Sequence, residues 1–305
     1  MYAIDTIIVG LDLTEMDETL LRYTGNLAGL IRPAKIYFLN VQRELDVSDA
    51  VKDSLGMGDQ PFDEYCEKRM RELVAEFFPD HTDYDVDFEV AEGNPATEVL
   101  KWTHIKEADL LIMGRKKDLE GSGVMPQQVT AKVRSSVLFV PEKFHGVNME
   151  NLLVPVDMSD YSRLAVEEAL SIRAKNPAVK ITSIFAFDLP AGYYTTGKSD
   201  EEFAAVLQDN YETDLDAFID SFDAEHIDRR VVWARTSGIA DTINQIAHDE
   251  GMDLIIMGAK GRTLASSLFL GSVTGKLVVR DNDIPLLVVK DKSQSFDFWE
   301  MIRSL

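Results

Sequence analysis

The chain of 305 residues is poor in cysteine and in positive charge, and it has no long hydrophobic run. Its single cysteine, Cys66, cannot form an intramolecular disulfide, which favours a reducing environment. No apolar stretch approaches the ~20 residues that span a bilayer, and the first ten residues lack the basic and apolar regions of a signal peptide. We therefore expect a cytoplasmic protein with no membrane partner.

Lysine and arginine number 31, against 53 aspartate and glutamate residues, so the formal net charge is −22. Nucleic-acid binding requires a basic face that neutralises phosphates, and we expect no nucleic-acid partner. One phosphate-binding loop is still compatible with this charge, because backbone N–H groups and a few local cations suffice for it. Hydrophobic residues make up 45% of the chain, and the length favours two domains of ordinary size.

Short apolar segments alternate with amphipathic ones, which is typical of βαβ units and a parallel sheet covered on both faces. The expected strands are 4–11, 35–41, 85–90, 109–113 and 137–140 in the first half, and 151–156, 180–187, 229–234, 253–257 and 286–289 in the second. The expected helices are 15–31, 61–78, 93–105, 127–134, 159–175, 199–222, 238–250 and 272–280. We also expect Thr14 to be the N-cap of the first helix and residues 42–60 to form a loop.

The second half repeats the first at a shift of about 145 residues. The matching pairs are Asp12 with Asp157, Gly93 with Gly238, and Gly114 with Gly258. Three pairs at nearly one shift predict a duplicated domain, with boundaries at 1–145 and 149–305. The predicted fold is therefore α/β, with two doubly wound, five-stranded parallel-sheet domains of Rossmann-like type.

One stretch of the second half has the composition of a phosphate-binding loop. Gly258 and Gly261 follow the strand at 253–257, and Gly271-Ser272 precedes the next helix. Glycines let the backbone approach an anion closely, and the N–H groups of a helix's first turn point toward it. This order of elements predicts a site for the phosphates of a nucleotide.

Together with Val154-Pro155-Val156-Asp157, the pattern Gly258-x2-Gly261-x9-Gly271-Ser272 resembles the ATP-binding members of the universal stress protein family. The resemblance covers almost the whole chain and implies two adenine nucleotide alpha-hydrolase-like domains in tandem. It implies a regulatory stress-response protein that binds ATP, with ADP or AMP as alternatives and Mg²⁺ as an accompanying ion. Family members pair through their last strands, which implies an intramolecular pseudo-dimer, with a homodimer of chains as a further alternative.

The resemblance places the nucleotide on residues of the second half. Pro155 and Asp157 would contact the adenosine, the backbone of Ala186 would contact the adenine, and the rest would surround the phosphates. The full set is Pro155, Asp157, Ala186, Gly258, Lys260, Gly261, Arg262, Gly271, Ser272, Val273 and Thr274. Two alternatives stay open, because Asp157 could cap the following helix and Arg262 could be a solvated surface charge.

The first half lacks the complete pattern. Lys117 stands in place of the second glycine, and Met125-Pro126-Gln127-Gln128 stands where Gly-Ser or Gly-Thr would open the next helix. Gly121-Ser122-Gly123 is a weaker candidate for anion contact. We therefore predict one nucleotide per chain, in the second domain, and a structural or regulatory role for the first.

The sequence shows no catalytic machinery and no metal ligands. Gly271 to Lys276 fails as a P-loop, since Leu277 stands where a hydroxyl would hold magnesium, and the five histidines have no paired metal spacing. Two alternatives remain, a slow ATPase or nucleotide-dependent enzyme that uses Asp157 and a metal, and a nucleotide-free scaffold with unknown protein partners. The apolar tail from Asp291 to Leu305 predicts either docking on its own domain or contact with another subunit.

Overall fold

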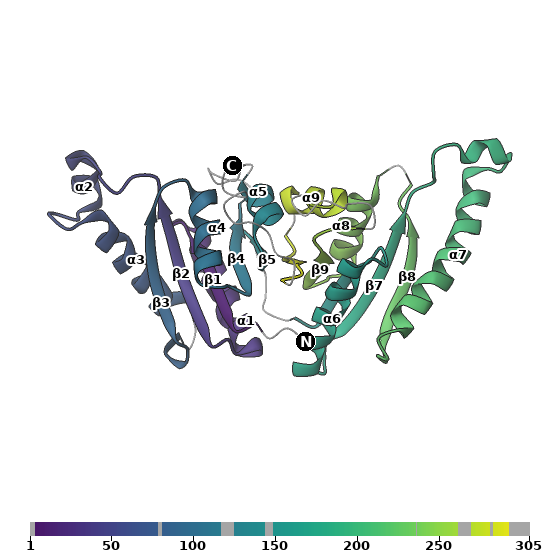
Figure 1. Cartoon of the computed structure of the whole chain (residues 1–305), viewed down its shortest axis with the longest axis horizontal. Coiled ribbons are helices and arrows are strands. Elements are labelled where there is room, and N and C mark those ends of the chain that lie inside the picture. Colours follow the sequence, from purple (N-terminus) through teal and green to yellow (C-terminus); the bar gives the residue numbers. More distant parts are fainter. Residues whose placement is uncertain are drawn as a thin grey trace. The chain divides into compact units, whose positions relative to one another are not determined.

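The computed structural model describes residues 4–78, 81–116, 125–143, 149–235, 237–261, 270–280 and 283–292 (Figure 1). The chain divides into two compact units, one within residues 2–147 and one within residues 148–290. Asp291 and Lys292 group with the N-terminal unit, where Lys292 forms an ion pair with Asp109.

The N-terminal unit is a five-stranded parallel sheet in the order β3-β2-β1-β4-β5. Its strands are β1 (Thr6–Leu11), β2 (Lys35–Gln42), β3 (Val86–Glu92), β4 (Leu110–Arg115) and β5 (Ser136–Pro141). Its helices are α1 (Met16–Ile31), α2 (Asp49–Leu55), α3 (Phe62–Phe77), α4 (Pro95–Ile105) and α5 (Met125–Lys132), with a 3₁₀ turn at His81–Asp83. The strand order reverses between β1 and β4, where crossovers leave in opposite directions.

The C-terminal unit repeats this topology, with the order β8-β7-β6-β9-β10 and all pairs parallel. Its strands are β6 (Asn151–Pro155), β7 (Lys180–Phe187), β8 (Ile227–Trp233), β9 (Leu254–Gly258) and β10 (Leu286–Val289). Its helices are α6 (Asp160–Lys175), α7 (Asp200–Asp220), α8 (Ile239–Asp249) and α9 (Ser272–Val279), with a 3₁₀ turn at Tyr193–Thr196. The equivalent reversal of strand order lies between β6 and β9.

The central strands of both sheets are buried on both faces, as their continuous apolar sequences require, whereas the edge strands β3 and β8 are only partly buried. Residues 254–258 of β9 are all buried, and so are residues 286–289 of β10. In the N-terminal unit α1 packs against α3, and α4 packs against α5. Right-handed crossovers that leave β1 and β4 in opposite directions put these two pairs on opposite faces of the sheet. The predicted α/β fold with two doubly wound, five-stranded domains is confirmed.

Two local predictions are wrong. The expected loop at 42–60 contains helix α2, which is only seven residues long and has no buried residue, since its apolar Val51 and Leu55 are exposed. Thr14 is not the N-cap of α1, because the helix begins at Met16 and Glu15 is the capping residue. The Thr14 hydroxyl donates instead to the Asp12 carboxylate, at 2.6 Å.

Several predictions fall on parts of the chain outside the described residues. They are Lys117, Gly121-Ser122-Gly123, Arg262 and the tail from residue 293 onward. Within the described part of the chain, no helix combines the length and apolarity that a membrane span requires.

Candidate functional site

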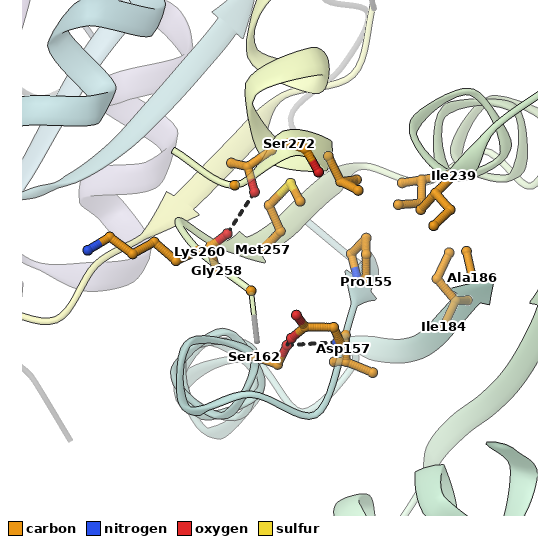
Figure 2. A pocket seen from close by; sticks show the side chains of 16 residues that line it. Pro155, Asp157, Ser162, Ile184, Ala186, Ile239, Met257, Gly258, Lys260 and Ser272 are labelled. Carbon is orange, nitrogen blue, oxygen red and sulfur yellow. Dashed lines mark hydrogen bonds between the residues drawn. The ribbon is translucent and has the colours of Figure 1, made fainter. Parts of the chain in front are cut away.

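A cavity of about 290 Å³ lies in the C-terminal unit, at the carboxyl ends of β6, β7 and β9 (Figure 2). Further parts of its wall come from the start of α8 and the first turn of α9. The strand order reverses between β6 and β9, and ligands of open α/β sheets bind in the crevice at such a reversal. The volume is close to the lower end of the range for small-molecule sites.

Ten of the eleven predicted site residues line this one cavity. They are Pro155, Asp157, Ala186, Gly258, Lys260, Gly261, Gly271, Ser272, Val273 and Thr274. The structure thus brings together residues from four separate segments of the sequence, while their binding of a nucleotide stays a prediction. Six lining residues were not predicted: Val156, Ser162, Ile184, Ile239, Ile243 and Met257.

One end of the cavity is apolar and has backbone groups at its edge. Ile184 and Ala186 of β7 lie opposite Ile239 of α8 (Figure 2). The N–H of Val156 donates to the carbonyl of Ile184 at 2.8 Å. Successive residues of a strand direct their backbone groups to opposite neighbours, so every second residue faces the same neighbour. Ala186 lies two residues after Ile184, and its N–H and C=O therefore face the β6 side, where β6 has already ended.

The carboxylate of Asp157 is held by two serines of the following turn. Its Oδ1 accepts the Ser159 N–H at 3.1 Å and the hydroxyls of Ser159 and Ser162 at 2.5 and 2.6 Å. The Asp157 N–H in turn donates to the Ser162 Oγ at 2.8 Å. The N-cap of α6 is Ser159, so the alternative in which Asp157 caps this helix is wrong.

The glycines of the loop stand where no side chain fits. A Cβ atom on Gly258 would lie 2.7 Å from the backbone carbonyl oxygen of Tyr161, and one on Gly261 would overlap Oδ2 of Asp157. Backbone atoms cannot move aside as a flexible side chain can, so Gly258 requires glycine, whereas a side chain at position 261 would displace the Asp157 carboxylate. The loop therefore lies against the first turn of α6 and against Asp157.

The first turn of α9 is fastened to the end of β9. The Gly271 N–H donates to the carbonyl of Ala259 at 2.9 Å, and the buried Thr274 hydroxyl donates to the carbonyl of Gly258 at 2.9 Å. The first N–H groups of a helix have no intrahelical acceptor, and those of α9 begin at Ser272. This end of the cavity has the geometry of an anion site.

Lys260 lines the cavity, but its side chain extends away from Asp157 and Ala186 (Figure 2). Its ammonium nitrogen lies 5.5 Å from the centroid of the Tyr161 ring, in a cation–π contact. Burial lowers the pKa of this lysine. Lys260 therefore belongs to the loop end of the cavity and not to its apolar end.

A sequence model of the universal stress protein family matches residues 3–141 and, separately, residues 148–290. The chain belongs to the universal stress protein family. It is 29% identical over 161 residues to a universal stress protein of Methanocaldococcus jannaschii, a match that covers 48% of this chain and 99% of that protein.

Two solved structures show the fold over nearly the whole length of this tandem universal stress protein. One is a universal stress protein of Archaeoglobus fulgidus, with a TM-score of 0.65 and 16% identity, covering 95% of this chain and 99% of that one. The other is a functionally unknown protein of Pseudomonas aeruginosa, with a TM-score of 0.63 and 16% identity, covering 99% and 95%.

The N-terminal domain of this universal stress protein has different side chains at the equivalent positions. Asp17 occupies the place of Ser162 and accepts the N–H groups of Asp12 and Leu13 at 3.3 and 2.8 Å. Burial, and then the neighbouring Asp12 carboxylate, raise the pKa of Asp17 to about 7. Asp12 forms an ion pair with Lys116.

A charged side chain also stands in the N-terminal domain at a position where the C-terminal cavity is apolar. Glu98 stands at the position equivalent to Ile243, and its carboxylate pairs with Lys101 at 3.0 Å. The two domains thus share a topology and differ in the charge of the side chains at these equivalent positions. In the described part of both domains, no group of three or more His, Cys, Asp or Glu side chains could hold a metal ion.

Proposed function

We propose that this universal stress protein binds one ATP molecule, in the cavity of its C-terminal domain, and acts as a regulatory protein in the stress response. One observation carries the proposal. Ten predicted residues from four segments line a single cavity at the reversal of strand order. The fold explains the position of the cavity, and the residues explain its chemistry.

The apolar end suits the adenine base. Ile184, Ile239 and Ile243 provide apolar surface on which a planar base can pack. The N–H of Ala186 matches the acceptor N1 of adenine, and its C=O matches the amino group at C6. Guanine presents a donor and an acceptor in the reverse order there, so this edge favours adenine over guanine.

The glycine loop and the start of α9 suit the phosphates. The close-packed Gly258 and Gly261 expose backbone to the cavity, and the positive end of the α9 dipole lies at Ser272. The exposed Ser272 hydroxyl adds a donor. Mg²⁺ would arrive as the ATP complex and be held chiefly by phosphate oxygens.

Binding is favoured over rapid hydrolysis because Oδ1 of Asp157 already accepts three hydrogen bonds. That oxygen serves to fix the turn after β6. ADP and AMP remain alternative ligands with the same base and fewer phosphates. The pairing of the two domains and the identity of protein partners stay predictions.

Isothermal titration of the full chain with Mg·ATP tests the proposal, and native mass spectrometry counts the bound nucleotides. We expect one ATP per chain and its loss in the double variant Gly261→Val with Ser272→Ala. Glu98→Gln in the other domain is the matched control and should bind normally. Two equivalents of ATP, or unchanged binding by the double variant, would refute the proposal.

The regulatory role has a separate test in cells that lack the protein. Wild-type protein should restore survival under stress, whereas the Gly261→Val, Ser272→Ala variant should not. Equal restoration of survival by both proteins would show that the stress role does not require nucleotide binding. Release of phosphate well above background, abolished by Asp157→Asn, would favour the slow ATPase instead.

A further inference from the structure

The two domains carry different residues at one equivalent position, Ser162 in the C-terminal domain and Asp17 in the N-terminal domain. We propose that Ser162 is a positioning residue that makes its crevice selective for an anionic nucleotide. Its hydroxyl holds Asp157 in the cavity wall and leaves Asp157 as the only carboxylate among the described residues that line the cavity. The proposal rests on the nucleotide-binding function proposed above and names the residue that permits it.

The Ser162 hydroxyl makes two complementary contacts with one residue. Its oxygen accepts the Asp157 N–H at 2.8 Å, and its hydrogen is donated to Asp157 Oδ1 at 2.6 Å. A hydroxyl can accept and donate in this way, whereas an ionised carboxylate can only accept. Ser162 is 4% exposed, so its own orientation is fixed by packing.

Asp17 shows what a carboxylate does at the same position. It is 1% exposed and takes the N–H groups of both Asp12 and Leu13. It cannot donate to the Asp12 carboxylate while it is ionised, and like charges at this range repel. The Asp12 side chain is accordingly half exposed and pairs with Lys116.

The backbone turn beside the two residues is alike in both domains, so the difference between the domains lies in their side chains. Leu13 and Met158 occupy equivalent positions and both have left-handed backbone angles, with φ of 59° and 60°. The turn after the first strand is therefore conserved in shape between the domains. One such difference is that the aspartate of that turn accepts a hydroxyl hydrogen bond in the C-terminal domain and has a second carboxylate beside it in the N-terminal domain.

Among the described residues that line the cavity, two side chains carry charge. Asp157 and Lys260 are the titratable side chains among its lining residues, and the Lys260 side chain extends away from Asp157 (Figure 2). A carboxylate at position 162 would lie against Asp157 at the edge of a polyphosphate site. In a half-buried setting such repulsion is strong enough to oppose ATP binding.

The test is ATP titration of full-length Ser162→Asp at about pH 6 and about pH 8, around the pKa of about 7 at Asp17. We expect the variant to lose at least about tenfold in ATP affinity at the higher pH. It should recover part of this loss at the lower pH, because burial and a neighbouring carboxylate raise the pKa of a carboxyl group at this position, as they do at Asp17. Wild type measured at both pH values corrects for titration of ATP itself.

Ser162→Asn is the matched control, because it has the shape of aspartate without its charge. Its loss of affinity should be smaller and independent of pH, and Asp17→Ser in the other domain should leave affinity unchanged. Wild-type affinity in Ser162→Asp at both pH values would overturn the inference. So would equal losses in the Asp and Asn variants at both pH values.

Different results would refute the proposed function and the role of Ser162. If wild type binds no ATP, the proposed function fails and this inference fails with it. If wild type binds one ATP but the affinity for ATP does not depend on the residue at position 162, only this inference fails. Should Ser162→Asp not fold by circular dichroism, Ser162→Ala decides, because it should bind ATP several-fold more weakly at both pH values, whereas unchanged affinity would overturn the inference.

Discussion

The hydroxyl of Thr274 donates a 2.9 Å hydrogen bond to the carbonyl oxygen of Gly258, sixteen residues earlier in the chain. Both groups are buried, and the bond joins the first turn of α9 to the last residue of β9. Thr274→Val keeps the shape and leaves that carbonyl without its donor. We expect a loss of about 1–2 kcal/mol in the free energy of unfolding, measured by urea denaturation.

Thr274→Ser restores the hydroxyl and should recover most of this loss. The same pair of variants also separates stability from binding. If the bond positions the start of α9 for a phosphate, Thr274→Val should weaken ATP binding more than Thr274→Ser does. Equal stability of the Val and Ser variants would show that this bond contributes nothing to folding.

Gly258 and Gly114 occupy equivalent positions but face different neighbours. A Cβ on Gly258 meets the backbone of Tyr161 at 2.7 Å, whereas one on Gly114 meets the flexible side chain of Met16 at 2.6 Å. We expect Gly258→Ala to destabilise by about 3 kcal/mol and Gly114→Ala by about 1 kcal/mol. Thermal or urea unfolding of the two variants gives the comparison, and the reverse order would contradict it.

Gly261→Ala should impair the site more than the fold. The added methyl overlaps Oδ2 of Asp157, so the loop or the carboxylate must move. We expect ATP affinity to fall by about tenfold or more, with a change of about 1 kcal/mol or less in stability. Titration calorimetry measures the affinity for ATP, and urea denaturation measures the stability. A loss of stability without a loss of affinity would contradict the prediction.

Gly29 provides a control substitution with the opposite sign. It is exposed in α1, and a Cβ there meets nothing within 4 Å. Alanine is the better helix former, so Gly29→Ala should raise the free energy of unfolding by about 0.5–1 kcal/mol. Its ATP affinity should equal that of wild type, and any decrease in the urea midpoint would contradict the prediction.

Asp17 should make the stability of the protein depend on pH. Its folded pKa of about 7 lies above the unfolded value, so the folded state holds the proton more tightly. Stability from this group is therefore present at acidic pH and is lost as the pH rises from about 4 to about 7. We expect urea midpoints to fall across this window in wild type.

Asp17→Asn removes the titration, and the loss of stability across that window should be smaller in this variant by up to a few kcal/mol. The difference between the two proteins isolates this carboxyl group, because other shifted groups are present in both. Lys290 is one such group, since burial lowers its pKa to about 7. Identical pH profiles for wild type and Asp17→Asn would contradict the assignment.

The strands and most helices were predictable because their burial follows a period that is visible in the sequence. Continuous apolar runs such as 254–257 belong to strands buried on both faces, and glycines mark where the chain turns. Helix α2 was not predicted because seven residues with a single pair of large apolar side chains, Val51 and Leu55, are too short a pattern to distinguish from a loop. The glycine loop and its partners were predictable because their spacing along the chain is itself the signal.

The other residues that line the cavity could not be predicted from the sequence in the same way. Ile239 and Ile243 belong to the apolar stripe of a helix, and such residues look the same whether they face a core or a ligand. Ser162 had a usable signal, since the repeat aligns it with Asp17. A change from hydroxyl to carboxylate beside a shared aspartate indicates that the two crevices differ in chemistry.

Gly114 has been retained although the N-terminal domain lacks the rest of the glycine pattern. In both domains this position lies against the first turn of the first helix, so the packing of helix on strand demands a small residue there. The first glycine of the pattern is therefore a property of the architecture, and its presence has little diagnostic value. A search for ligand-competent relatives should weight Gly261 and the pair Asp157 and Ser162, whose contacts belong to the cavity alone.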